Sequence, residues 1–241
     1  MYMTPPLSPI QNSILSTLKN AKSLRYSELA PDTVPNDLFN YHLQFLVKKE
    51  LLEKTGDGYS LSTKGIKYVA DPYVSPDSSA SFFKLNVITI VSRKVGGTLE
   101  ILNQLRTSNP SYGKVGVMGG VVLKGESTAD AATRKLKQET GLDAEFRVVG
   151  MERRMLYKSG KLFSDTLFPI CYTDTYTGAL LPVTSFGEHK WVSLVQAIKN
   201  ESAPFDSLSG IATVLRSLEN GTLNTLPFFF TESVQDDTFG V

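Results

Sequence analysis

The segment from Gly119 to Leu142 constrains the fold more than any other part of the sequence. It begins with paired glycines, which allow the backbone to approach a ligand closely. Ser127 or Thr128 then supplies a helix N-cap, and Gly141 supplies a C-terminal cap. Between these signals the sequence predicts a helix from about residue 128 to residue 140. The segment therefore predicts a loop, a helix and a second loop.

Several residues of this segment fall on one spacing without a gap. They are Gly120, Glu126, Arg134, Leu136, Glu139, Gly141 and Leu142. The spacing resembles the box of the Nudix hydrolase family, which reads Gly, five residues, Glu, seven residues, Arg-Glu-apolar-x-Glu-Glu-x-Gly-apolar. A strand-like segment at 101–106 and a Glu-x-x-Trp pattern within 188–194 extend the resemblance over about residues 82–218. The resemblance implies an α/β fold, namely a Nudix α/β/α sandwich with a mixed sheet.

Three positions of the predicted helix share one face, because they lie three and four residues apart. The resemblance implies that active family members carry glutamates at all three and hold divalent ions on this acidic face. Mg²⁺ prefers such oxygen ligands, and the ion activates water and stabilises charge on a pyrophosphate. Here the face consists of Lys135, Gln138 and Glu139, so one carboxylate remains. We expect Lys135 to pair with Glu139 at i, i+4 and the loss of two ligands to weaken metal binding.

The resemblance leaves two alternatives for the site. In an active enzyme, a rearranged set of Glu126, Glu139 and Glu188 would be catalytic, with Mg²⁺ or Mn²⁺ bound by Glu139 and Glu126. In an inactive domain, Glu126 and Arg134 would instead hold the loop against the helix, and Glu188 would be a surface or capping acid. The candidate ligand-binding residues in either case are Gly119, Gly120, Arg134 and Arg106.

The first segment of the chain has a different pattern. A helical face is marked by Ile10, Ile14, Leu15 and Leu18. A short helix is predicted around residues 26–30, and a third begins after Pro35, where a proline is tolerated. Two short strands around the glycine turn at 56–58 then predict a β-hairpin. This order of elements, together with the amino-acid sequence of residues 40–65, resembles the winged helix-turn-helix of bacterial and archaeal transcription regulators.

In such a fold the third helix enters the major groove of double-stranded DNA. The residues expected to contact DNA are Asn36, Asn40, Tyr41, Gln44 and Lys48. Residues 1–70 hold eight Lys and Arg residues and six Asp and Glu residues, so their electrostatic footprint is weak. The alternative is a winged helix used for dimerisation or packing. Phe45, at a position expected to be solvated, favours such a protein contact.

The domain boundaries follow from a change in composition and in hydrophobic periodicity along the chain. Residues 71–81 are rich in Pro, Ser and Asp and have no helical or strand period, which is typical of a linker. We therefore predict a winged helix-turn-helix domain at 1–70, a linker at 71–81, a Nudix domain at 82–220 and a C-terminal tail at 221–241. From Thr231 onward the tail is expected to be loose.

Bulk composition sets the remaining expectations. Cys171 is the one cysteine, which excludes an intrachain disulfide, favours a reducing compartment and predicts an inert buried thiol. Apolar runs such as 85–91 are much shorter than the ~20 residues that a membrane span requires. The net charge of +1 gives no global case for nucleic acid or membrane binding. We expect a cytoplasmic protein without a membrane partner.

Three functional hypotheses remain open at this point. The first is a ligand-responsive transcription regulator that binds a nucleotide-like diphosphate compound, with weak or absent hydrolase activity, and double-stranded DNA. Known regulators of this type place the winged helix after the Nudix domain, so their ligand and interface do not transfer. The second is an active divalent-metal-dependent hydrolase of nucleoside diphosphate derivatives that uses a nonstandard acid set. The third is an interaction module, and a homodimer is one open alternative for its assembly.

Overall fold

The chain forms two compact units in a computed structural model that describes residues 7–56, 58–70, 84–109, 112–158, 160–199 and 208–236. The first unit comprises Met1–Ser81 and Thr107–Tyr112, and the second comprises Phe82–Arg106 and Gly113–Val241. The predicted linker at 71–81 lies outside the described residues. Within the described ranges, no helix is long and apolar enough to cross a membrane.

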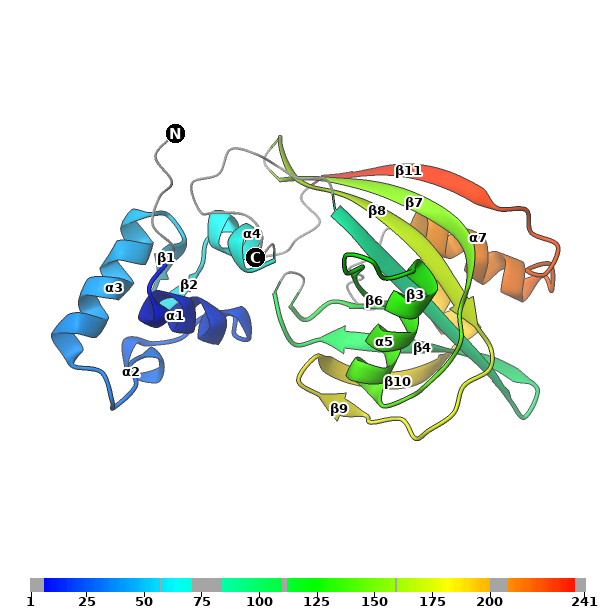
Figure 1. Ribbon diagram of the computed structural model, residues 1–241, viewed down its shortest axis with the longest axis horizontal. Coiled ribbons are helices and arrows are strands. Elements are labelled where there is room, and N and C mark those ends of the chain that lie inside the picture. The colour runs from blue at the N-terminus through cyan, green and yellow to red at the C-terminus, as the bar shows by residue number, and fades with distance from the viewer. Residues whose placement is uncertain are drawn as a thin grey trace. The chain divides into compact units, whose positions relative to one another are not determined.

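The first unit contains four helices and a two-stranded hairpin in its described residues (Figure 1). In chain order the elements are α1 (Pro9–Lys19), α2 (Tyr26–Leu29), α3 (Asn36–Lys48), β1 (Leu52–Thr55), β2 (Gly58–Leu61) and α4 (Thr63–Ala70). Helix α1 starts with a capping box, in which Ser8 and Gln11 each bond the other's backbone N–H. The apolar faces of α1 and α3 meet in a core that includes Leu18, Phe39 and Leu43. The predicted helices and hairpin are therefore present.

Two features of this unit differ from expectation. Residues 63–65, which the resemblance placed in the wing, instead begin helix α4 (Thr63–Ala70). Its first turn is capped by Ser62, whose hydroxyl accepts a hydrogen bond from the Gly65 N–H at 3.0 Å. Phe45 was expected to be solvated, and this was wrong, because its half-buried ring packs against the unit's own core. Phe45 therefore gives no support to a protein contact.

The second unit is built on a mixed sheet. Its strands are β3 (Lys84–Val95), β4 (Thr98–Arg106), β5 (Val115–Gly116), β6 (Met118–Val121), β7 (Arg147–Lys158), β8 (Lys161–Thr173), β9 (Val183–Thr184), β10 (Gly187–Ser193) and β11 (Phe229–Asp236). The main path runs β11-β7-β8-β3-β4-β10-β9, with β5 beside β4 and β6 beside β3. The β11–β7 and β3–β8 pairs are parallel, and the other pairs are antiparallel.

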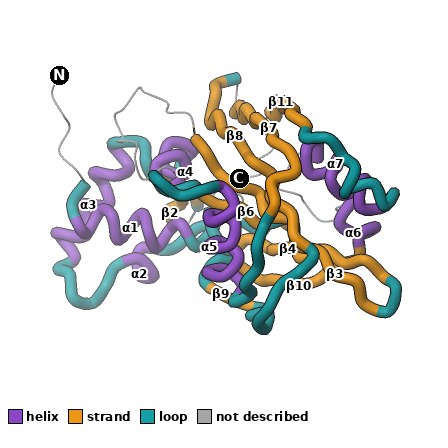
Figure 2. The backbone as a smooth tube through the Cα atoms, turned by 45° about the vertical axis from the view of Figure 1, so that its right-hand side comes forward, coloured by secondary structure: helices purple, strands orange, loops and turns teal. Residues whose placement is uncertain are grey.

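Helices cover both faces of this sheet (Figure 2). Successive strand residues point to opposite faces, so Ile88 and Ile90 join one core whereas Val87 and Val91 join the other. The first core also receives residues from α6 (Leu194–Lys199) and α7 (Leu208–Glu219). The second receives residues from α5 (Thr128–Thr140). The arrangement is the α/β/α sandwich with a mixed sheet that the sequence predicts.

The C-terminal segment corrects one expectation. The tail from Thr231 was expected to be loose, but residues 229–236 form strand β11 at the edge of the sheet, in parallel register with β7. The alternation of inward and outward side chains explains this result. Ser233 points inward and donates a hydrogen bond to the buried carboxylate of Glu152 at 2.7 Å, whereas Val234 points out and is 65% exposed. The tail is thus part of the sheet as far as Asp236.

Candidate functional site

Helix α5 forms with the caps that the sequence predicts. The Ser127 hydroxyl accepts a hydrogen bond from the Asp130 N–H at 3.1 Å, which satisfies one of the free donors of the first turn. At the other end Gly141 has a φ of 77°, and its N–H donates to the Lys137 carbonyl at 3.0 Å. The predicted boundaries of the helix are confirmed.

Glu126 and Arg134 form a closed pair between the loop and the helix. The guanidinium donates to both carboxylate oxygens, at 2.6 Å to Oε1 and 2.8 Å to Oε2. Glu126 also accepts from the Leu123 N–H at 2.9 Å, and Arg134 donates to the Val121 carbonyl at 2.9 Å. The Arg134 hydrogen bond, supported by the Leu123 N–H, lowers the pKa of Glu126 to about 2. This geometry is the loop-holding arrangement that we had weighed for these two residues.

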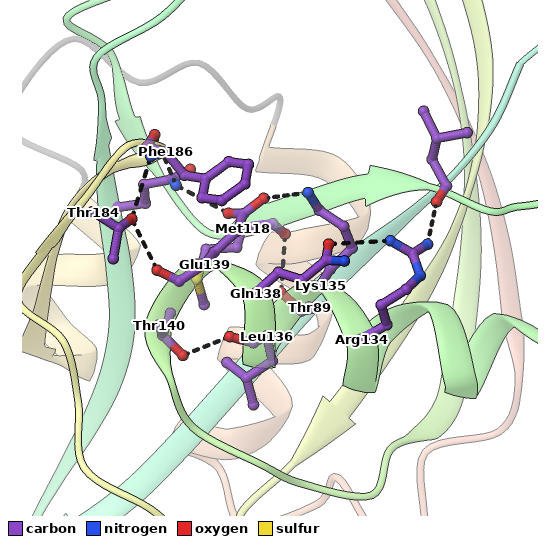
Figure 3. A network of polar contacts seen from close by, with 12 residues as sticks. Thr89, Met118, Arg134, Lys135, Leu136, Gln138, Glu139, Thr140, Thr184 and Phe186 are labelled. Carbon is purple, nitrogen blue, oxygen red and sulfur yellow. Dashed lines mark hydrogen bonds and ion pairs between the residues drawn. The ribbon is translucent and has the colours of Figure 1, made fainter.

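Glu139 is the surviving carboxylate of the helix face, and both of its side-chain oxygens are engaged (Figure 3). Its Oε1 lies 2.6 Å from the Lys135 Nζ, which confirms the expected i, i+4 pair. Its Oε2 accepts a hydrogen bond from Gln104 Nε2 at 3.0 Å. The residue is 4% exposed. Glu139 is therefore a buried carboxylate whose charge is compensated by the Lys135 ammonium.

The paired glycines make room for this arrangement. A Cβ atom on Gly120 would collide with the aliphatic stem of Lys135, so the lysine crosses directly over that glycine. A Cβ atom on Gly119 would lie 2.6 Å from the carbonyl oxygen of Val87. Val87 belongs to β3, the strand with which β6 pairs. Gly119 thus permits sheet pairing, and Gly120 permits the path of Lys135.

Residues that the sequence analysis did not single out complete the site. Gln104 Nε2 lies 3.2 Å from His189 Nε2 and donates to the Phe186 carbonyl at 3.2 Å. The Thr184 hydroxyl donates to the Glu139 backbone carbonyl at 3.0 Å. Burial lowers the pKa of His189 below its ordinary 6.5, against the opposing effect of the Glu139 carboxylate. The register of β10 with β4, which sets His189 opposite Gln104, is the signal that joins them, and no local pattern contains it.

The third candidate acid lies on the other face of the sheet. In β10, His189 points toward the α5 side with Trp191, which packs against the α5 core. Glu188 alternates with it and shares a face with Val192, which belongs to the α6 and α7 core. Glu188 is exposed. The structure does not bring Glu126, Glu139 and Glu188 together.

These residues do not fit a divalent ion. In the described ranges, no group of three or more His, Cys, Asp or Glu side chains is placed to hold a metal. The Lys135 ammonium is in contact with Glu139 Oε1, where a cation ligated by that carboxylate would have to bind. Two of the three carboxylates that the resemblance implies on this face are replaced by an ammonium and by a neutral amide, Lys135 and Gln138. We therefore assign no reaction step to a metal ion.

The other candidate residues can also be located. Arg106 ends β4, where its N–H donates to the Lys114 carbonyl and its carbonyl accepts from the Gly113 N–H. Cys171 is fully buried, and burial raises the pKa of its thiol to about 12, as expected for an inert residue. In the first unit, the candidate DNA contacts are exposed along α3. They are Asn36, Asn40, Tyr41, Gln44 and Lys48.

Comparisons with known proteins identify the second unit. The MutT protein from Bacillus halodurans is 16% identical, with 65% of this chain and 93% of that chain covered and a TM-score of 0.51. The NUDIX domain of Shewanella oneidensis NrtR, solved with ADP ribose, is 20% identical, with 63% and 97% covered and a TM-score of 0.48. No curated protein sequence matches the chain. The model of the NUDIX domain matches residues 83–210, just over half of the chain. The chain therefore belongs to the NUDIX domain family.

Proposed function

We propose that the chain is a ligand-responsive transcription regulator. Its NUDIX unit binds a nucleotide-like diphosphate compound with weak or absent hydrolase activity, and its first unit is a winged helix-turn-helix that binds double-stranded DNA. The observation that carries this proposal is the buried Lys135–Glu139 pair, which has its ammonium 2.6 Å from the one carboxylate left on the helix face. Metal-assisted hydrolysis requires a cation that activates water. An ammonium supplies positive charge without that chemistry.

The DNA-binding part of the proposal is supported by the order and exposure of the first unit's elements. Three helices precede a hairpin, and the third helix carries exposed amide, phenol and lysine side chains. Amide side chains such as those of Asn40 and Gln44 are suited to reading adenine edges in the major groove. Lys48, in the last turn of α3, is suited to a phosphate contact.

The test of the NUDIX unit compares hydrolysis with binding. The protein is incubated with a panel of nucleoside diphosphate derivatives in Mg²⁺ and in Mn²⁺, and binding of the same compounds is measured by calorimetry. We expect binding without turnover. Turnover that Glu139→Gln abolishes would instead support the alternative, an active hydrolase with a nonstandard acid set. Activity gained in a Lys135→Glu/Gln138→Glu double variant would support a pocket that has lost its metal site.

The test of the first unit is selection of binding sequences from random double-stranded DNA by the full chain. We expect Asn40→Ala and Gln44→Ala to relax sequence preference, since those side chains would contact bases. Lys48→Ala should weaken binding to all sequences and reduce the salt dependence by about one ion. Absence of DNA binding at low salt would contradict this part of the proposal and leave ligand binding untouched.

A further inference from the structure

The Lys135 side chain is held in one place by its neighbours. Its stem crosses the backbone of Gly120, where a Cβ atom would not fit. Its ammonium contacts Glu139 Oε1 at 2.6 Å and lies 4.9 Å from the centre of the Phe186 ring (Figure 3). The side chain is 15% exposed. The charge is therefore fixed in position before any ligand arrives, which lowers the entropy lost on binding.

The ammonium retains hydrogen-bonding capacity. A lysine ammonium has three N–H donors and no acceptor. Glu139 takes one of them, and the face of the Phe186 ring attracts the cation without an oxygen acceptor. Across the described parts of the chain, Lys135 engages no further acceptor. At least one donor remains for an outside anion.

The charge of the helix face also favours an anion. Three carboxylates at these positions would carry three negative charges and repel a diphosphate unless metal ions were bound. Lys135, Gln138 and Glu139 together are neutral. Arg134, the neighbouring cation on α5, is already engaged by Glu126, by the Val121 carbonyl and by Gln138. Lys135 is thus the cation of this face that is best placed to meet a ligand.

We propose that Lys135 replaces the divalent ion as the cation of the ligand site. Its ammonium bridges Glu139 and an anionic oxygen of the diphosphate, so that binding requires no metal. This inference rests on the proposed function, because it assumes that the NUDIX unit binds a diphosphate. It adds that the site is independent of Mg²⁺. It also adds that the negative charge of Glu139 opposes the anion, whereas a glutamine there would still accept the lysine hydrogen bond without that charge.

The experiment is calorimetric titration of the full chain with ADP-ribose, ADP and pyrophosphate, in EDTA and in Mg²⁺. We expect the same affinity in both buffers within about twofold. Lys135→Gln should weaken binding by roughly tenfold or more, the usual effect of losing a charge-assisted hydrogen bond. Lys137→Gln is the matched control, because Lys137 lies on the same helix, is 63% exposed and pairs with Asp143. It should bind like the wild type.

Glu139→Gln separates the two kinds of cation. If the ammonium binds the ligand, removing the adjacent negative charge leaves the affinity unchanged or raises it. If a metal ion binds the ligand, the same change removes a metal contact and lowers the affinity. This arm does not depend on whether Lys135→Gln folds well. Circular dichroism of each variant checks the fold.

The outcomes distinguish this inference from the proposed function. Binding that needs Mg²⁺, or that Glu139→Gln weakens, overturns the role of Lys135 while ligand binding stands. Failure of all three probes to bind in both buffers overturns the proposed function and this inference with it. Titration with Mn²⁺ alone gives a further check. The Lys135→Glu/Gln138→Glu double variant should bind Mn²⁺ more tightly than the wild type, and equal affinities would count against the inference.

Discussion

Glu139 and Lys135 contribute unequally to stability, although they form one ion pair. Loss of the lysine in Lys135→Met leaves a carboxylate that is 4% exposed, with Gln104 as its remaining side-chain partner. Glu139→Gln removes the carboxylate and leaves the charge of Lys135 without its partner. The lysine side chain is long enough to turn its ammonium toward water. We expect destabilisation by about 3 kcal/mol for Lys135→Met and about 1 kcal/mol for Glu139→Gln in urea unfolding. Equal losses would contradict the asymmetry.

Gly120 and Lys135 should be coupled through the space that they share. In Gly120→Ala the new methyl group meets the lysine stem, so the side chain must shift, and we expect a loss of about 1–3 kcal/mol. In combination with Lys135→Ala most of that extra loss should disappear, which a double-mutant cycle measures. Gly119→Ala is the matched control. Its methyl group would meet the Val87 carbonyl, so Lys135→Ala should give it no relief.

His189 gives the site a dependence on pH. Burial lowers its pKa in the folded chain, so below 6.5 the unfolded chain takes up the proton first. Stability is therefore expected to fall as the pH drops below 6.5, down to the lowered pKa of the folded state. His189→Gln should flatten the profile of unfolding free energy in this range. Glu126 contributes to the free energy of unfolding in a different pH range. Its contribution is present above pH 4.5 and is lost as the pH falls from 4.5 to about 2. An unchanged slope in His189→Gln would contradict the prediction.

At the scale of elements, strand β11 shows how a chain terminus completes a core. Gly150 of β7 has no side chain, which leaves room for the Phe229 ring beside it. Further along, Ser233 donates to Glu152, which is fully buried. The terminal strand therefore supplies both apolar contact and a hydrogen bond to an internal charge.

Ser233→Ala should accordingly lower the free energy of unfolding by more than the removal of one small hydroxyl group would indicate. A hydrogen bond to a buried carboxylate contributes about 1.5–3 kcal/mol, and we expect a loss in that range by urea unfolding. Val234→Ala, one residue further and outward-facing, should change stability by less than about 0.5 kcal/mol. If the two substitutions have the same effect, then β11 does not contribute through Glu152.

The contrast between α5 and β11 shows what the sequence could predict. Helix α5 was predicted with its ends, because the Ser127 cap and the Gly141 stop both lie in one local stretch of the sequence. Strand β11 was missed, because its register depends on β7, a strand from a distant part of the sequence. A parallel pair has no turn between its strands that could mark it. The tail therefore carried no local signal of its place in the sheet.

The contacts of the candidate site also divide into those that local sequence could predict and those that depend on the register of distant strands. The Lys135–Glu139 pair follows from spacing within one helix. The loop-holding role of Glu126 and Arg134 was one of two alternatives that the sequence left open, and their ion pair fits it. The contacts of Glu139 with Gln104 and Thr184 join two separate strands to a helix, so no window of sequence contains them. Glu188 was grouped with Glu139 by family resemblance, and strand alternation puts it on the opposite face. Which face a strand residue occupies depends on register, and the sequence left that open.

At the scale of the whole molecule, the chain combines a NUDIX unit with a first unit that has its own hydrophobic core. A regulator requires that ligand binding in one unit changes the DNA affinity of the other. Such coupling is a free energy, and it is reciprocal. If the ligand changes the affinity for DNA by a given factor, then DNA changes the affinity for the ligand by the same factor. The proposed function therefore predicts two measurements that must agree.

The full chain is titrated with its selected DNA, with and without saturating ADP-ribose, and with ADP-ribose, with and without that DNA. We expect equal factors in the two directions, within the roughly 5- to 150-fold range of typical coupling. Lys135→Gln should shift the effect of the ligand on DNA affinity to roughly tenfold higher ADP-ribose concentration or more. It should leave ligand-free DNA binding intact, because the lysine belongs to the second unit. Lys48→Ala should weaken DNA binding with and without ligand alike and leave the factor unchanged. A factor of one in both directions, with both partners bound, would show that the two units act independently and would overturn the regulator.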